Sequence, residues 1–303
     1  MRVLVTGASG SIGKALTSHL ADKGHVVLGL DQEAEHARIL RAHAKAEPHS
    51  LDYTDCRRRA DVVGKAVRFG PECVVHLAAL TDVYGGWNAE HWLAENVLGT
   101  MNVIEAACAS GCERVIYGSS MDVHNPETWY AASKRSCESF AEVASEWFGA
   151  DGMEIVGLRF STVYGPNAPR GFIPMALKAL RAGAEIPLHC WPDIGRDVPI
   201  FPLRDWTYIE DVVRAIERVI ETPIGPGHGV YEIGTGESRT NKAVLAAIKG
   251  RLRLPAKVRH EPVPKGTPRF HTVDTSLFAQ EYKFRCETRV EDAFYAYLEE
   301  ATP

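Results

Sequence analysis

Three glycines spaced three residues apart, Gly7, Gly10 and Gly13, follow a short apolar run at the start of the chain. A helical pattern of apolar residues begins at Ser11, and a second apolar run at 25–31 lies within the roughly 30 residues of a nucleotide-binding βαβ unit. Here Gly7 permits a tight turn, Gly10 lets the backbone approach a pyrophosphate, and Gly13 allows close helix–strand packing. The run therefore predicts a dinucleotide site with the diphosphate at the helix N-terminus.

Apolar runs and helical patterns alternate along the first half of the chain. Further strands are expected at 73–79, 114–117 and 154–158, with helices at 89–109 and 126–148. Strands that alternate with helices at this spacing predict an α/β fold with a doubly wound, Rossmann-type parallel sheet.

Prolines punctuate the chain after residue 165 and indicate a smaller, mixed α/β substrate-binding lobe. We expect residues 1–164 to form the NAD-binding domain, with 206–236 returning to it. The smaller lobe would consist of 165–205 and 237–303. Segment 187–203 is predicted to be a long loop.

Composition excludes several classes of function. The net charge of −5 gives no indication of nucleic acid or an anionic membrane as a partner. No apolar run approaches the roughly 20 residues of a membrane span. The histidines show no paired metal-ligand spacing, so no metal is expected. The seven cysteines are scattered, which is typical of reduced thiols and predicts a cytoplasmic protein without a signal peptide.

Two acidic residues lie near the ends of early strands: Asp31 ends the second predicted strand, and Asp52 comes after the next strand. Asp31 stands where a carboxylate would bond the adenosine ribose and repel a 2′-phosphate, so the expected cofactor is NAD rather than NADP. The alternative for Asp31 is a solvated loop residue. Asp52 either faces the adenine edge or simply occupies a turn.

Tyr130 and Lys134 lie four residues apart in a predicted helix, so their side chains share one face. An ammonium beside a phenol favours the phenolate and is expected to lower the pKa of Tyr130, which suits an acid/base near neutral pH. Asn125 and Pro126 supply an N-cap and a first-turn proline, and predict the start of the helix. Beside a dinucleotide site, the pair predicts hydride transfer at a carbinol.

With these motifs in order, the chain resembles the extended short-chain dehydrogenase/reductase family, which includes the nucleotide-sugar epimerases and dehydratases. The resemblance covers nearly the whole chain. Each matching segment is weak alone, and their order is specific. The segments are Thr6–Gly13, His76–Ala79, Asn96–Thr100, Ser119-Ser120, Tyr130-x-x-x-Lys134, Leu158–Pro166, Arg204–Asp211 and Tyr231–Glu237.

The resemblance implies a role for each matching residue. Tyr130 would be the acid/base, Lys134 would lower its pKa and hold the nicotinamide ribose, and Ser120 would bond the reacting hydroxyl or carbonyl. Asn96 would support the site. The cofactor-binding positions are Gly7, Ser9, Gly10, Ser11, Ile12, Gly13, Asp31, Asp52, Leu77, Ala78, Ala79, Asn96, Tyr130 and Lys134. The substrate-binding positions are Thr81, Ser120, Thr162, Arg204 and Arg269.

Arg204 matches a family arginine that binds the diphosphate of the substrate, a task that suits a guanidinium. Its alternative role is a surface ion pair with Asp205 or Glu210. Arg269 is a weaker second candidate. Thr162 stands where many family members have asparagine, so one substrate contact is expected to differ.

The segment from Ser119 to Tyr130 is similar, without gaps, to that of UDP-N-acetylglucosamine 4,6-dehydratases. Those proteins carry an acid and a second ionisable group after the Ser/Thr, whereas this chain has Met121 and Asp122. Methionine cannot donate a proton. Asp122 is either a catalytic base or a loop residue that bonds its own backbone. The insertion 191–202 either covers the sugar pocket or is a plain surface loop.

The leading functional hypothesis is an NAD-dependent epimerase that acts on a nucleotide-diphosphate sugar through a transient keto-sugar. The alternatives are a nucleotide-sugar 4,6-dehydratase, a sugar dehydrogenase or reductase, and, in another class, a non-catalytic NAD-binding sensor. A homodimer through the helices at 89–109 and 126–148 is expected by resemblance. Small residues would allow close packing there, namely Ala106, Ala107, Ala141 and Ala144.

Overall fold

The computed structural model describes residues 1–32, 49–148, 152–166, 168, 170–192 and 199–293. Its centre is a seven-stranded sheet with the order β10-β6-β5-β4-β1-β2-β3, in which neighbouring strands are parallel. The strands are β1 (Arg2–Thr6), β2 (Val26–Asp31), β3 (His49–Tyr53), β4 (Cys73–His76), β5 (Arg114–Ser120), β6 (Glu154–Phe160) and β10 (Gly227–Ile233). The predicted doubly wound parallel sheet is confirmed.

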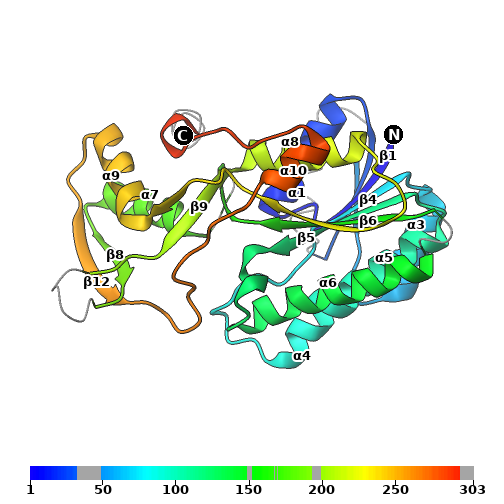
Figure 1. The fold of residues 1–303 in the computed structure, drawn as a ribbon, viewed down its shortest axis with the longest axis horizontal. Helices are drawn as coiled ribbons and strands as arrows, with labels where there is room; N and C mark the ends of the chain where they lie inside the picture. Colours follow the sequence, from blue (N-terminus) through cyan, green and yellow to red (C-terminus); the bar gives the residue numbers. More distant parts are fainter. Residues whose placement is uncertain (33–48, 149–151, 167, 169, 193–198, 294–303) are drawn as a thin grey trace.

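Helices cover both faces of this sheet (Figure 1). One apolar core lies beneath α1 (Ser11–Asp22), α8 (Ile209–Glu221) and α10 (Ser276–Tyr282). The opposite core lies beneath α3 (Arg59–Phe69), α5 (Gly99–Ala109) and α6 (Trp129–Phe148). The expected helix at 89–109 is built from α4 (Ala89–Trp92), a π-helical turn η1 (Leu93–Leu98) and α5.

The smaller lobe has its own core and two small sheets. One sheet has the order β11-β9-β7, and the other pairs β12 with β8. Its elements are β7 (Thr162–Tyr164), α7 (Phe172–Ala182), β8 (Glu185–Cys190), β9 (Leu203–Tyr208), β11 (Ser238–Thr240), α9 (Asn241–Leu252) and β12 (Lys257–Pro262). The chain thus enters this lobe after β6, returns to the large sheet through α8 and β10, and enters the lobe again at β11.

The predicted loop at 187–203 is wrong in its first part, because β8 continues to Cys190. Pro187 is tolerated there because β8 pairs on one side with β12 in a two-stranded sheet. Beyond the strand, Trp191 and Ile200 exchange two backbone hydrogen bonds of 2.9 Å. Residues 193–198 of the predicted insertion lie outside the described residues.

The predicted start of the Tyr130 helix at Asn125 and Pro126 is also wrong. A 3₁₀ turn, η2 (Met121–His124), follows β5 directly, and α6 begins at Trp129. The Thr128 hydroxyl accepts a hydrogen bond from the amide of Ala131 at 3.1 Å, which is the bond that an N-cap residue makes. A threonine three residues later therefore takes the role expected of Asn125.

The turn between β1 and α1 depends on glycine. Gly7 has a φ of 68°, and a Cβ added to it would lie 2.6 Å from the amide nitrogen of Ala78 after β4. A Cβ on Gly13 would lie 2.1 Å from the carbonyl oxygen of Gly7. The predicted reasons for these two glycines, a tight turn and close helix–strand packing, are both visible.

We predict that Gly13→Ala destabilises the fold by about 3 kcal/mol or more, because the methyl group would overlap backbone atoms that cannot move aside. The measurement is chemical unfolding followed by circular dichroism. Gly64→Ala in α3 is the matched control, since its Cβ would lie 3.5 Å from the end of the Arg68 side chain. We expect that control to be neutral or to stabilise the protein by up to about 1 kcal/mol. Equal losses in both variants would contradict this account.

Candidate active site

The carboxyl ends of β1 and β4 form the point where the sheet order changes direction, and ligands of doubly wound sheets bind at such a point. Gly10 precedes α1 without a side-chain cap, which leaves the helix N-terminus free for an anion. Ser11 and Ile12 form the first turn of that helix. Ser9 is buried, and its hydroxyl finds no hydrogen-bond partner among the described residues. This glycine cradle with an unsatisfied hydroxyl fits the diphosphate of a dinucleotide.

Asp31 lies at the end of β2 and accepts a hydrogen bond from the Ser9 amide at 2.9 Å. Its carboxylate therefore lies against the glycine loop, as the predicted contact with a ribose requires. Asp52 in β3 pairs with Lys65 of α3 at 2.8 Å. That ion pair gives Asp52 a partner within the protein, and its contact with an adenine stays a prediction.

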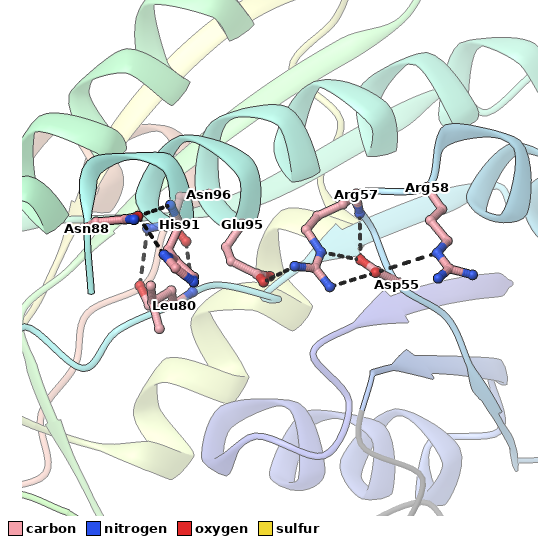
Figure 2. Close-up of polar contacts among 8 residues, drawn as sticks. All are labelled: Asp55, Arg57, Arg58, Leu80, Asn88, His91, Glu95 and Asn96. Carbon is pink, nitrogen blue, oxygen red and sulfur yellow. Dashed lines mark hydrogen bonds and ion pairs between the residues drawn. The ribbon is translucent and has the colours of Figure 1, made fainter. Parts of the chain in front are cut away.

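The segment after β4 is held in place by Asn96, as Figure 2 shows. The Asn96 amide accepts from the Leu80 N–H at 2.7 Å, donates to the Leu80 carbonyl at 3.1 Å, and donates to the Ser133 hydroxyl at 2.8 Å. Asn96 is completely buried. It thus links the segment after β4 to the helix that carries Tyr130, which fits its expected supporting role.

The other expected cofactor positions of this segment come close to the glycine turn. The amide of Leu77 donates to the Thr6 carbonyl at 3.1 Å, and that of Ala78 donates to the Thr6 hydroxyl at 3.3 Å. Ala79 is half-buried, and Thr81 is exposed. These bonds set the backbone of the segment against β1, where Gly7 leaves room for it.

Arg57, which the sequence did not single out, fixes the loop after β3 (Figure 2). Its guanidinium contacts Asp55 at 2.8 Å and Glu95 of η1 at 2.9 Å. The Asn102 side chain also donates to the carbonyls of Cys56 and Arg57 at 2.9 and 3.1 Å. The loop after β3 and the π-helical turn that carries Asn96 are therefore tied together.

His76 was quoted only as part of a family segment, yet it connects three elements. Its Nδ1 lies 2.7 Å from the Thr6 hydroxyl and its Nε2 lies 3.1 Å from the Thr100 hydroxyl. Burial, with a smaller contribution from the charge of Lys134, lowers the pKa of His76 to about 3. A neutral imidazole therefore joins β1, β4 and α5.

Ser120, Tyr130 and Lys134 converge at the carboxyl end of β5. Ser120 is the last residue of that strand, and a hydrogen bond between its side chain and Tyr130 favours the phenolate. The Lys134 ammonium is buried and donates to the Gly118 carbonyl at 2.7 Å. The Tyr130 ring also meets Trp92 edge-on, with centroids 6.1 Å apart. Three of the four candidate catalytic residues are thus brought together, and the fourth, Asp122, follows in η2.

The expected effect of Lys134 on Tyr130 does not appear in the protein alone. Burial raises the pKa of Tyr130 well above its ordinary value, and the Asp122 carboxylate raises it further. The same burial lowers the pKa of Lys134. The Lys134 Nζ donates to the Gly118 carbonyl of β5 and therefore points toward that strand. Within the protein, the hydrogen bond from the Ser120 side chain, rather than Lys134, is the influence that lowers the pKa of Tyr130.

Asp122 lies in η2, and its backbone amide donates to the Ser120 hydroxyl at 3.2 Å. Its carboxylate contacts His271 of the smaller lobe, with Oδ1 and Nε2 2.9 Å apart. The sequence interpretation missed His271. The available signal was its position two residues after Arg269, on the same side of an extended segment.

Arg204 lies on β9, close enough to Asp122 for their charges to interact. Its guanidinium donates to the carbonyls of Leu203 and Pro268 at 2.8 and 2.9 Å. Burial lowers its pKa, while the charge of Asp122 raises it. The proposed surface pairing with Asp205 is wrong, because the Asp205 carboxylate is buried and accepts hydrogen bonds from Thr235, Gly236 and Thr207.

The two remaining substrate candidates flank Arg204. Thr162 in β7 pairs with Trp206 of β9 and is half-buried. The backbone of Arg269 accepts a hydrogen bond from the Leu203 amide at 3.1 Å, but its side chain is exposed and lies over the Phe270 ring. Thr162 and Arg204 therefore share one small sheet, and a substrate contact by Arg269 stays a prediction.

Within the described ranges, no group of three or more metal-ligating side chains comes together. No helix of those ranges is long and apolar enough to cross a membrane.

Comparisons with known proteins agree with this geometry. Residues 3–234 match the model of a family described as the NAD dependent epimerase/dehydratase family. A UDP-glucose 4-epimerase of Mycolicibacterium smegmatis is 30% identical, over 91% of this chain and 90% of that protein. Protein CapI of Staphylococcus aureus is 26% identical, over 99% and 98% of the two chains.

A solved structure of MoeE5 in complex with UDP-glucuronic acid and NAD has 26% identity and a TM-score of 0.84, and covers 99% of this chain and 98% of that chain. MoeE5 in complex with UDP-glucose and NAD gives a TM-score of 0.86. The fold thus has counterparts along the full length of known proteins.

We predict that the protein binds NAD more tightly than NADP. Asp31→Asn should lower the ratio of the NADP to the NAD dissociation constant at least about tenfold, because the variant no longer repels a 2′-phosphate. Isothermal titration of nucleotide-free protein gives both dissociation constants. Asp61→Asn, at an exposed position in the first turn of α3, is the control and should leave the ratio unchanged. Tighter binding of NADP by the unmodified protein would refute the role of Asp31.

Proposed function

The chain belongs to the NAD dependent epimerase/dehydratase family and is an NAD-dependent enzyme, and from this premise we propose that it is a 4-epimerase of UDP-linked sugars. The similarity to a UDP-glucose 4-epimerase over 91% of the chain supports the reaction. The likeness to MoeE5, solved with both UDP-glucuronic acid and UDP-glucose, supports a UDP-hexose or UDP-hexuronate as substrate.

The convergence of Ser120, Tyr130 and Lys134 is the observation that carries this proposal. When bound, NAD supplies the acceptor and later the donor of the hydride. Ser120 holds the C4 hydroxyl of the sugar while Tyr130 takes its proton, and the same Tyr130 returns the proton after the keto-sugar has turned its other face. Lys134 lies one helical turn after Tyr130, and its Nζ donates to the Gly118 carbonyl at 2.7 Å.

The cofactor is held by the residues around the switch point of the sheet. The glycine turn and Ser9 bind its diphosphate, Asp31 binds the adenosine ribose, and the segment Leu77–Ala79 lies beside it. On the substrate side, Arg204 reaches the diphosphate of the UDP group, and Thr162 and Thr81 contact the sugar. These roles rest on the positions of the side chains around one cleft.

A dehydratase is the second candidate, since the segment from Ser120 to Tyr130 is as short as in such enzymes. Elimination of water needs a group that protonates the departing hydroxyl. Met121, which takes the place of the family's acid, is 3% exposed and has no proton to give. The side chains beside Ser120 therefore favour epimerisation. A non-catalytic sensor would not need Ser120, Tyr130 and Lys134 to meet.

We predict that Tyr130→Phe lowers kcat at least about 100-fold, because the variant cannot move the proton of the sugar hydroxyl. The assay is conversion of UDP-glucose, UDP-galactose and UDP-glucuronic acid, measured by chromatography and NMR of the products. Tyr282→Phe removes another buried phenol, in α10, and should keep its activity. Wild-type activity of Tyr130→Phe on every substrate turned over would refute the catalytic role.

The products of the same assay separate the alternatives. An epimerase retains its NAD and gives a product of unchanged mass. Loss of one water from the product would show a dehydratase, and stoichiometric release of NADH would show a dehydrogenase.

We further propose a homodimer, which is supported by an exposed apolar face along η1 and α6. Phe140, Val143 and Trp147 lie on one side of α6 and are 48, 52 and 77% exposed, and Leu93 and Leu98 of η1 are 57 and 48% exposed. The expected contribution of four alanines is wrong. All four are at most 5% exposed and pack into the core under the sheet, namely Ala106, Ala107, Ala141 and Ala144.

We predict that Val143→Glu produces a monomer, since a buried and unpaired carboxylate would oppose association. Light scattering coupled to size-exclusion chromatography gives the mass in solution. Val67→Glu changes an equally exposed valine, 53% accessible in α3, and should leave the mass unchanged. A wild-type protein that is already monomeric would contradict the proposed dimer.

All seven cysteines are free thiols. This supports our proposal that the protein works in a reducing compartment such as the cytoplasm.

A further inference from the structure

An ionisable pair joins the two lobes beside the residues that handle the substrate proton. His271 Nε2 lies 2.9 Å from Asp122 Oδ1, and their side chains are 12 and 27% exposed. The carboxylate comes from η2 in the large domain, and the imidazole comes from the segment between β12 and α10. The proposed reaction, as described so far, uses neither side chain.

Asp122 is close enough to Tyr130 for its charge to matter. Its backbone amide donates to the Ser120 hydroxyl at 3.2 Å, and the Ser120 side chain in turn bonds Tyr130. After burial, the Asp122 carboxylate is the largest influence that raises the pKa of Tyr130. An uncompensated charge on Asp122 would therefore make Tyr130 a poorer acceptor of the substrate proton.

The backbone of His271 is held from both sides in the smaller lobe. Its amide donates to the Leu203 carbonyl at 3.1 Å, and its carbonyl accepts from the Ser238 hydroxyl at 2.8 Å. These bonds attach the histidine to β9 and β11, next to Arg204. Because these bonds already fix the backbone of His271, its imidazole contacts the Asp122 carboxylate with little further loss of conformational entropy.

Other charged groups surround the pair. Arg204 of β9 feels the charge of Asp122. His124 of η2 pairs with Glu232 of β10, whose other oxygen accepts from the Asp274 amide at 2.8 Å. The remaining ionisable groups on the segment itself are exposed, namely Lys265, Arg269 and Asp274. Among these groups of the described residues, His271 is the one whose side chain lies 2.9 Å from the Asp122 carboxylate.

We propose that His271 is a positioning residue of the acid–base step, which balances the Asp122 carboxylate and so sets how readily Tyr130 accepts the proton of the substrate. This inference rests on the proposed function in one respect, the role of Tyr130 as the base. It goes beyond that function because it assigns a role to a lobe-bridging pair outside the Ser120, Tyr130 and Lys134 group.

The sign of the effect differs for the two partners. A protonated imidazole at His271 offsets the charge of the Asp122 carboxylate 2.9 Å away. Removal of the imidazole leaves the Asp122 charge uncompensated and raises the pKa of Tyr130. The pH below which activity is lost therefore moves up. Removal of the carboxylate lowers the pKa of Tyr130, so activity persists to a lower pH.

The test is the pH profile of kcat/KM for the unmodified holoenzyme and three variants. The acidic limb is the part of the profile where kcat/KM falls with decreasing pH. We expect its midpoint to move to lower pH by about one unit in Asp122→Asn, and to higher pH by a similar amount in His271→Gln. His271→Lys restores a fixed positive charge and should bring the limb back to the wild-type position or below it. Shifts in the same direction, or losses that are equal at every pH, would overturn the proposal, because a purely structural pair would give those results.

A second measurement does not depend on turnover. The protein labelled with ¹³C at tyrosine Cζ is titrated by NMR with NAD bound, and Tyr130→Phe identifies the resonance. The midpoint of Tyr130 should fall in Asp122→Asn and rise in His271→Gln. Equal midpoints in all these proteins would refute the pair's role. If no UDP-sugar is converted, the proposed function fails, while this titration still decides the inference.

Discussion

The close approach of two backbone segments at Gly7 governs the arrangement of the whole cleft. No side chain can stand between the turn after β1 and the segment after β4, so both reach the same point at the carboxyl edge of the sheet. The neutral His76 then ties β1 and β4 to α5, and Asn96 carries the connection on to Ser133 in α6. The dinucleotide turn and the helix of Tyr130 are thereby parts of one rigid assembly.

Local patterns were enough to predict the sheet, the glycine turn and the shared helix face of Tyr130 and Lys134. Each of these follows from apolar periodicity, from helical spacing or from a motif at the end of a strand. The role of Ser120 beside Tyr130 was implied by the family resemblance. His271 escaped prediction because its contact with Asp122 depends on how the second lobe folds back over η2. The start of α6 was misjudged because Asn125 caps the end of the 3₁₀ turn after Ser120, while Thr128 caps the start of the helix.

The pKa of Tyr130 shows most clearly what sequence spacing leaves out. A lysine four residues away predicts a positive charge next to the phenol. The Lys134 side chain instead donates to the Gly118 carbonyl, and burial is the largest influence on the pKa of Tyr130. The electrostatics of the phenol are therefore set by groups that meet it only in three dimensions. Among them are a carboxylate from the next turn and, through it, an imidazole from the other lobe.

The position of β10 bears on how the chain is made. This strand closes one edge of the sheet by pairing with β6, from Gly227↔Glu154 to Ile233↔Phe160. About 65 residues separate the end of β6 from the start of β10, which a ribosome takes several seconds to add. During that time the backbone of β6 faces outward without its neighbour, and an open strand edge invites pairing with other chains. The nascent protein therefore exposes an open strand edge at β6 while its second lobe is being synthesised.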